Sequence, residues 1–209
     1  MYMPEDNDQL VALLRGGDST ALEKLFTQYS PRLRKLIFFR LDARLKRRID
    51  VDDLLQDVWL AVSQRLPHFL KQPEAASCYV WMRLVTGQTI TDIHRRHLGA
   101  KARDVGREFS LDFVSSDATS RSIADFLLAP GTSPTQVVAR AEAAEQIRQA
   151  VSQMDPTDQE VLALRHFEEL SNAEVAEVLE ISGAAASTRY IRALKKLQEV
   201  LKRFPDLLR

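Results

Sequence analysis

The feature of this sequence that most limits its fold is the spacing of its apolar residues, which follows the period of an α-helix in nearly every segment. One example is the run formed by Val51, Leu54, Leu55, Val58 and Val62. No segment shows the sustained alternation of apolar and polar residues that a half-buried strand needs. The pattern predicts an all-α protein, and a chain of 209 residues is long enough for two small helical domains.

The first predicted domain, residues 1–103, begins with two helical segments. Asp18 is placed to cap a helix whose apolar face extends to Tyr29. Pro31 is expected to interrupt this helix, because proline lacks the backbone N–H that a helix interior uses. Helical spacing then resumes over residues 33–45.

Two further helices complete the first predicted domain. One follows Asp50 and has Trp59 on its apolar side. The other runs from about Tyr79 to His97, and the stretch before it, which contains Pro67 and Pro73, is expected to be a loop.

Residues 104–133 lose the helical period and are rich in Ser, Thr, Asp, Gly and Pro. They are predicted to form an acidic, flexible linker with at most a short helical turn near residues 123–128. The second domain, residues 134–209, begins with a serine cap followed by Pro134, and Asp155 with Pro156 repeats that arrangement. We expect helices from Pro134 to about Gln153 and from Pro156 to about Glu168.

The stretch SNAEVAEVLEISGAAASTRYIRALKKL predicts two helices joined by a tight corner. Ser171 and Glu174 have the spacing of a capping box at the start of the first helix. Ile181 falls in the turn, and Ser182 can cap the second helix. The buried face of that second helix is predicted to consist of Ala186, Tyr190, Ala193 and Leu197.

The other faces of the second helix carry small, hydroxyl and basic side chains: Ser187, Thr188, Arg189, Arg192, Lys195 and Lys196. This division is typical of a recognition helix, in which short side chains approach base edges and cations contact guanine or phosphate. A helical hairpin with a solvated basic face is the alternative interpretation.

The chain has 29 basic and 29 acidic side chains, but their distribution is uneven. The segment Arg32–Arg48 has a net charge of +7, and the segment Gly183–Arg203 has a net charge of +5. Asp50–Asp57 contains four aspartates and no basic residue. Such segregation favours one surface for a polyanion and another for a basic protein partner.

Several classes of protein are disfavoured by the sequence. No stretch has the roughly 18 uncharged apolar residues of a membrane span, and the acidic N-terminus does not resemble a signal peptide, so we expect a cytoplasmic protein without membrane insertion. Cys78 is the sole cysteine, which excludes an intramolecular disulfide and a zinc site built from cysteines. His94 and His97 lack further ligands for a metal. No catalytic constellation or phosphate-cradling loop is present, so neither enzymatic activity nor a cofactor is predicted.

Three segments together resemble the extracytoplasmic-function (ECF) sigma factors of the sigma-70 superfamily. They are Asp50–Val62, Trp81–His97 and Met154–Ser182. The resemblance implies a helical bundle like sigma region 2, a helix-turn-helix domain like sigma region 4, and a flexible linker between them. It further implies that the protein binds bacterial core RNA polymerase and directs initiation at promoters through their −10 and −35 elements.

The resemblance also implies roles for individual residues. Asp53, Gln56 and Asp57 are expected to dock on the clamp helices of the polymerase beta-prime subunit, and the second domain on the beta flap. The residues expected to contact the −10 element are Arg83, Gln88, Asp92, Arg95 and Arg96. Those expected to contact the −35 element are Ser187, Thr188, Arg189, Arg192, Lys195 and Lys196. An anti-sigma protein is a further partner that the resemblance implies.

Two alternatives remain open at this stage. A helix-turn-helix regulator that binds duplex DNA without docking on polymerase would share the second domain. A helical adaptor that binds only protein would share the architecture, although the basic residues of the second helix argue against it. Trp81 has two interpretations as well, as a core residue or as a stacking surface for a base.

Overall fold

The computed structural model describes residues 4–71, 77–98, 116–127 and 145–203, and the regular secondary structure in these ranges is helical. The prediction of an all-α fold is confirmed for this part of the chain. The chain divides into two compact units, Met1–Arg103 and Asp104–Arg209.

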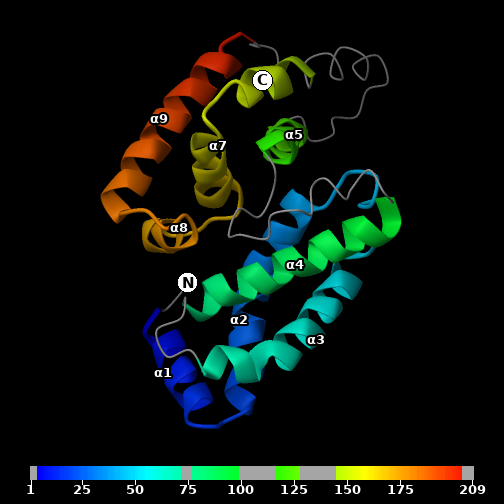
Figure 1. Ribbon diagram of the computed structural model, residues 1–209, viewed down its shortest axis with the longest axis vertical. Helices are drawn as coiled ribbons and strands as arrows, with labels where there is room; N and C mark the ends of the chain where they lie inside the picture. The colour runs from blue at the N-terminus through cyan, green and yellow to red at the C-terminus, as the bar shows by residue number, and fades with distance from the viewer. Residues whose placement is uncertain (1–3, 72–76, 99–115, 128–144, 204–209) are drawn as a thin grey trace. The chain divides into compact units, whose positions relative to one another are not determined.

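The first unit is a helical bundle. Its elements are α1 (Pro4–Arg15), α2 (Thr20–Arg40), α3 (Val51–Leu70) and α4 (Cys78–Leu98). Helices α2, α3 and α4 each contact the other two, and α1 packs on α2 (Figure 1). The predicted apolar faces supply the core, which includes Leu25, Leu33, Leu36, Ile37, Leu54, Val58 and Val62. Trp59 is half-buried, and its ring meets the edge of Phe26 at a centroid distance of 5.0 Å.

Two prolines lie inside helices that the sequence predicts they would end. Helix α2 continues through Pro31, and α3 continues through Pro67 to Leu70. Pro31 has no N–H for the carbonyl of Thr27, but the hydroxyl of Ser30 donates a hydrogen bond to that carbonyl at 2.9 Å. A local side chain thus replaces the missing backbone donor, which explains why α2 is not interrupted.

The sole cysteine of the chain lies at the first residue of α4. Cys78 is buried, with 5% of its surface exposed. Burial raises the pKa of its thiol to about 12, although the positive charge of Arg15 acts in the opposite direction. The thiol is therefore protonated and unreactive in the folded protein.

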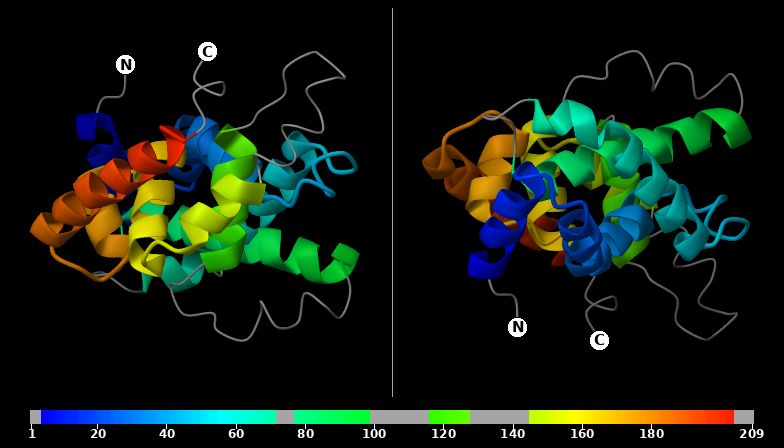
Figure 2. Two further views of the ribbon diagram at one scale, coloured as in Figure 1. Left: turned by 90° about the horizontal axis from the view of Figure 1, so that it is seen from above. Right: turned by 90° about the horizontal axis from the view of Figure 1, so that it is seen from below.

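The second unit contains six described helical segments. They are α5 (Ser116–Leu127), residues 145–152, α7 (Pro156–Leu162), the π-helical turn η3 (Ala163–Phe167), α8 (Asn172–Val178) and α9 (Gly183–Leu201). Helix α9 lies against both α7 and α8 (Figures 1 and 2). The predicted cap at Pro134 and the first part of its helix lie outside the described residues.

The prediction of a linker over residues 104–133 needs correction, because this range contains the 12-residue helix α5. Helix α5 packs on α7 with Ile123 and Ala124 buried. The hydroxyl of Ser120 donates to Oε1 of Gln159 at 2.6 Å, and that of Thr119 donates to Oε2 of Glu160 at 3.1 Å. Tertiary hydrogen bonds thus order a stretch whose Ser and Thr content favours a loop when it is considered alone.

The helix-turn-helix corner forms as its caps predict. The Ser171–Glu174 capping box is present with both hydrogen bonds, and Oγ of Ser182 accepts from the backbone N–H of Ala185 at 3.1 Å. The turn is closed by the N–H of Ile181, which donates to the carbonyl of Ala176 at 3.0 Å. Glu180 adopts a left-handed conformation with φ of 51° in this turn.

Candidate polymerase-binding and nucleic-acid-binding surfaces

An acidic surface lies on α3. Asp53, Gln56 and Asp57 are all exposed, whereas their neighbours Leu54 and Val58 are buried against the bundle. The three side chains share a face because positions three and four apart are neighbours on a helix. This face can offer carboxylates and an amide to a basic protein surface.

Leu60 extends this surface in a way that the sequence alone did not single out. Its side chain is 56% exposed, and it follows Gln56 and Asp57 by four and three residues. The inward stripe of α3 passes through Val58 and Val62, and Leu60 falls on the opposite side. An exposed leucine beside two polar side chains is typical of the apolar centre of a protein interface. In the sequence, the position of Leu60 outside the inward stripe of α3 could have identified it as an exposed apolar residue.

The C-terminal half of α4 presents a mixed polar surface. Arg95 and Arg96 are exposed, and Nη1 of Arg95 lies 3.7 Å from Oδ1 of Asp92. Gln88 is half-buried, and its Oε1 accepts a hydrogen bond from Nη1 of Arg65 on α3. Gln88, Asp92 and Arg95 therefore follow one another along a single face of α4.

Arg83 does not lie on this surface. Its side chain is buried, with 3% exposed, among the core positions of α4 that include Met82 and Thr86. The expectation that Arg83 supplies charge to DNA is therefore corrected. Trp81 stacks on Phe69 at 4.4 Å with an interplanar angle of 20°, which supports its role in packing within the first unit.

His94 supports the structure of the first unit. Its Nε2 accepts a hydrogen bond from the backbone N–H of Asp42 at 3.2 Å. Burial lowers the pKa of His94, an effect that the carboxylate of Asp42 opposes and the cation of Arg44 reinforces. His97 is exposed, and no cluster of metal-ligating side chains is found among the described residues.

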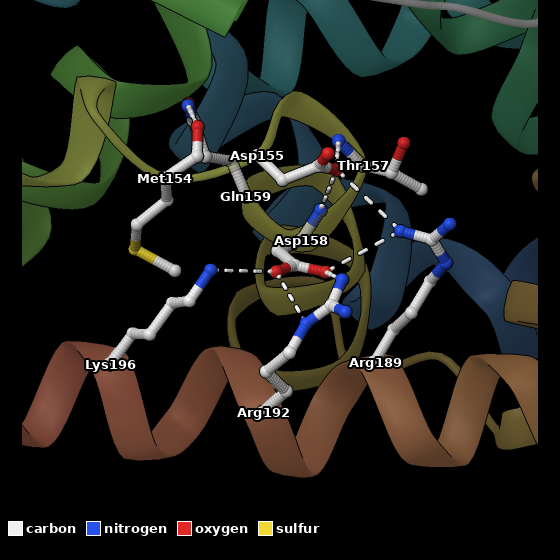
Figure 3. A network of polar contacts seen from close by, with 8 residues as sticks. All are labelled: Met154, Asp155, Thr157, Asp158, Gln159, Arg189, Arg192 and Lys196. Carbon is white, nitrogen blue, oxygen red and sulfur yellow. Dashed lines mark hydrogen bonds and ion pairs between the residues drawn. The ribbon is translucent and has the colours of Figure 1, made fainter.

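Helix α9 has an inner stripe, a flank and an outward face. Ala186, Ala193 and Leu197 form the buried stripe. The outward face consists of exposed side chains from Ala184, Ser187, Thr188, Ile191 and Lys195. Arg189, Arg192 and Lys196 lie on the flank that faces α7 (Figure 3).

The flank cations of α9 converge on one carboxylate, that of Asp158 in α7 (Figure 3). Asp158 is fully buried, and Nε and Nη2 of Arg192 donate to its two oxygens at 2.9 and 2.5 Å. Nζ of Lys196 lies 3.3 Å from Oδ2, and Nη1 of Arg189 lies 3.5 Å from Oδ1. Arg189 also lies 3.5 Å from Asp155, the residue that caps α7. One aspartate therefore connects the flank of α9 to the start of α7.

The electrostatics of this cluster favour an ionised Asp158. Burial acts to raise the pKa of Asp158, but hydrogen bonds from Arg192 and Lys196 outweigh it, and the pKa is lowered overall. The same contacts raise the pKa of Arg192. The cluster thus holds the flank cations in fixed positions, while about half of the Arg192 side chain, 50%, stays exposed.

Two features of this unit were missed by sequence reasoning. Asp158 is far from its partners in the sequence, so only the fold brings it to them. Ile191 is 53% exposed in the middle of the outward face, between Thr188 and Lys195. Its offset from the buried stripe of α9 was the indication that could have identified it.

No helix within the described ranges has the length and apolar character needed to cross a membrane.

Comparisons with known proteins agree with this arrangement. Residues 144–197 match the family model for sigma-70 region 4. The RNA polymerase sigma-H factor of Pseudomonas aeruginosa is 25% identical over 203 residues, which cover 97% of each chain. The ECF RNA polymerase sigma factor BldN of Streptomyces coelicolor is 22% identical, with coverage of 92% of this chain and 65% of BldN.

A solved structure supports the fold over nearly the whole chain. The structure of CnrH in complex with the cytosolic domain of CnrY matches with a TM-score of 0.50 and 20% identity, covering 93% of this chain and 96% of CnrH. An all-α chain with a capped helix-turn-helix corner, a region 4 match and a sigma factor relative aligned over 97% of each chain is similar to the ECF sigma factors of the sigma-70 superfamily, which direct RNA polymerase to promoters.

Proposed function

We propose that the two units divide the work of promoter-specific initiation. The first unit docks on polymerase and engages the −10 element, and the second recognises the −35 element. The observation that carries this proposal is the separation of surfaces: an exposed acidic face on α3 lies in one unit, and a capped recognition helix with an outward polar face lies in the other.

The polymerase contact is assigned to Asp53, Gln56, Asp57 and Leu60. The acidic and amide groups suit the basic side chains of the beta-prime clamp helices, and Leu60 adds apolar area to the same face. Leu60 can serve this role because 56% of its surface is exposed before docking. The second unit is assigned to the beta flap.

The −10 contact is assigned to the face of α4 that carries Gln88, Asp92, Arg95 and Arg96. Arg95 and Arg96 suit the phosphates of a DNA strand, and Gln88 can pair with adenine through its amide. Gln88 is already held by Arg65, which fixes the orientation of the amide before DNA arrives. Arg83 is left out because its side chain is buried.

The −35 contact is assigned to the outward face of α9. Ser187 and Thr188 lie near its N-terminus, where a recognition helix meets base edges, and Ile191 suits the methyl group of thymine. Lys195 and the exposed part of Arg192 suit phosphate. Arg189 and Lys196 contribute mainly through Asp158, to which they are tied.

The setting of the protein follows from this role. It acts in the cytoplasm, where polymerase and promoter DNA are found, and it performs no catalysis of its own. CnrH was solved with the cytosolic domain of CnrY, and we propose that a regulatory protein of this kind, an anti-sigma protein, binds the present chain as well.

The deciding experiment is binding of the purified protein to bacterial core RNA polymerase, followed by transcription of genomic DNA with and without it. Specific new start sites that appear only in its presence are expected, and they would supply both promoter elements. Tight binding to duplex DNA without polymerase binding would instead favour a regulator that acts alone.

A further inference from the structure

Half of the basic side chains in the segment of α9 lie around one carboxylate rather than on the outward face. The segment Gly183–Arg203 has six basic residues, and three of them, Arg189, Arg192 and Lys196, surround Asp158 of α7 (Figure 3). Their side chains are 33%, 50% and 44% exposed. These cations are close enough to solvent to reach DNA, but a group inside the protein holds them.

The cluster contains more cations than are needed to join α7 to α9. Arg192 alone makes a two-pronged ion pair with Asp158, at 2.9 and 2.5 Å, and a pair of this geometry already fixes both side chains. Lys196 and Arg189 add contacts at 3.3 and 3.5 Å to the same carboxylate. These two additional contacts require a reason other than helix packing.

Cations on a recognition helix that are not held in this way bind DNA phosphates of any sequence. Each phosphate that is neutralised releases counterions, and this electrostatic contribution supplies essentially all nonspecific binding. Phosphate contacts carry no sequence information. Arg189 and Lys196 lie on the flank rather than on the face of Ser187, Thr188 and Ile191. A duplex held by the flank would therefore not be read by the outward face.

Asp158 is a stronger partner for these cations than a DNA phosphate is. It is fully buried, so removal of the cations would leave an uncompensated charge inside the protein, which is strongly unfavourable. A phosphate on the DNA surface is hydrated, and salt counterions neutralise it when no protein cation is present. The flank cations therefore stay on Asp158 when DNA of unrelated sequence approaches.

We propose that Asp158 is a positioning residue that sets the specificity of the second unit: it withholds Arg189 and Lys196 from DNA phosphates and so keeps the affinity for unrelated duplex DNA low. Specificity is a difference between two affinities, and it rises when the affinity for the wrong ligand falls. Arg192 still offers Nη1 to DNA, because Asp158 uses only its Nε and Nη2. This inference rests on the proposed function, because it takes α9 as the helix that reads the −35 element.

The first test measures binding of the full chain, without polymerase, to a short duplex of unrelated sequence over a range of salt concentrations. Asp158→Asn should make the slope of log K against log salt steeper by roughly 1.8, because Arg189 and Lys196 then reach two duplex phosphates. For an unchanged affinity at 1 M salt, the gain in affinity is roughly 60-fold at 0.1 M salt. A purely structural role predicts the opposite sign, because a destabilised unit binds DNA less well. Unchanged or weaker binding by the folded variant would overturn the inference.

The same variant is then tested on the −35 duplex that the transcription experiment identifies. Asp158→Asn should raise the affinity for this duplex less than the affinity for unrelated DNA, because the outward face already fixes how the −35 duplex docks. The ratio of the two affinities therefore falls. An equal gain on both duplexes would show that Asp158 limits affinity without setting specificity, which would also overturn the proposal.

Two controls separate the release of cations from changes in net charge and stability. Glu199→Gln removes one negative charge from an exposed position near the end of α9 and should leave the slope unchanged. Ser120→Ala removes the buried hydrogen bond to Gln159 at 2.6 Å, so it weakens the same unit without altering any charge. It should not raise the affinity. A gain in either control as large as that of Asp158→Asn would contradict the proposal.

The second test keeps Asp158 intact, so it remains decisive if Asp158→Asn does not fold. It compares Arg189→Gln/Lys196→Gln with Lys195→Gln/Lys202→Gln, which removes two exposed cations from the same segment. The exposed pair should lower the slope by roughly 1.8, and the flank pair by less than half of that value. Equal losses would show that the flank cations reach phosphates in the wild-type protein, and the inference would fail.

These measurements are independent of polymerase, so the two proposals can fail separately. If polymerase binding fails while the slopes behave as expected, the proposed function fails and the role of Asp158 holds for a helix-turn-helix regulator. If polymerase binding succeeds and the two pairs of substitutions lower the slope equally, only the inference about Asp158 fails.

Discussion

Asp158 of α7 and Arg192 of α9 form a two-pronged ion pair, with Nε and Nη2 of the arginine 2.9 and 2.5 Å from the two carboxylate oxygens. The aspartate is fully buried, while the arginine is half exposed. The pair therefore joins the interior of the second unit to the surface of its recognition helix. Arg192 therefore has a structural role in the second unit, in addition to any contact that it makes with DNA.

Asp158→Asn should destabilise the second unit, because the flank cations of α9 lose the buried charge that holds them. We expect the free energy of unfolding to fall by about 1–3 kcal/mol. This is less than the loss for a fully buried ion pair, because the partly exposed cations can be hydrated when the carboxylate is removed. Thermal and denaturant unfolding measure this loss. Asp53→Asn on the exposed face of α3 is the control and should change stability by less than about 0.5 kcal/mol. Equal stabilities of the two variants would contradict a structural role for the cluster.

Asp53→Lys/Asp57→Lys should abolish binding to core polymerase without loss of helicity. Both carboxylates face away from the buried side of α3, so reversal of their charge repels a basic partner and leaves the core intact. Binding is measured by co-migration with core polymerase, and helicity by circular dichroism.

The control for this charge reversal is Asp8→Lys/Glu23→Lys, which alters two exposed acidic residues on α1 and α2. Polymerase binding by this control should be retained. Retained binding by the folded Asp53/Asp57 variant would remove the docking assignment.

Ile191→Ala should reduce discrimination at one thymine of the −35 element. Contact with a thymine methyl is worth about 0.8 kcal/mol, or about fourfold in affinity. Replacement of each −35 thymine by uracil, which lacks the methyl group, should weaken wild-type binding at one position and leave the Ile191→Ala variant unaffected there. The same uracil effect in wild type and variant would place Ile191 away from the base.

The stability of the first unit should depend on pH through His94. Because burial lowers the pKa of His94 in the folded state, the unfolded chain binds its proton at a higher pH than the folded chain does. Stability is complete above about pH 6.5, the ordinary value, and falls as the pH drops from there toward the lowered pKa.

The measurement for His94 is denaturant unfolding of wild type and His94→Gln between pH 5 and pH 8. Glutamine can still accept a hydrogen bond from the N–H of Asp42, but it does not titrate. The decline at low pH should be smaller in His94→Gln, and His97→Gln at an exposed position should behave like wild type. A decline of equal size in all three proteins would assign it to other groups.

Glu180→Gly should stabilise the second unit. Glu180 has φ of 51°, a left-handed conformation that glycine adopts without the steric penalty of a side chain. We expect a gain of about 0.5–1 kcal/mol in the free energy of unfolding. Glu177→Gly inside α8 should instead lose about 1 kcal/mol, because there glycine disfavours the helix. A loss in both variants would show that the Glu180 side chain makes a compensating contact.

The sequence predicts local features of this protein well, and the reason is their short range. The Ser171–Glu174 capping box needs only two side chains three residues apart, and its two hydrogen bonds are present. The inward stripe of α3 follows from the helical period alone, which also places Asp53 and Asp57 outward.

Features that depend on distant partners were not predictable. Asp158 and Arg192 are 34 residues apart in sequence and meet only in the packed unit. Arg83 has the sequence character of a surface residue, but the packing of α4 buries it. Helix α5 is rich in Ser and Asp, which favour loops and caps when the stretch is considered alone, and its contacts with α7 help to decide its conformation.

Because Cys78 is buried, chemical labelling of its thiol can report local opening of the first unit at the start of α4. A thiol-reactive dye can modify the folded chain only after the first turn of α4 separates from the bundle, because the thiol is covered and its pKa is about 12. Since the chain has no other cysteine, the rate of labelling measures that single event without any engineered probe. Docking on polymerase, if it holds the bundle closed, should appear directly as slower labelling at this one atom.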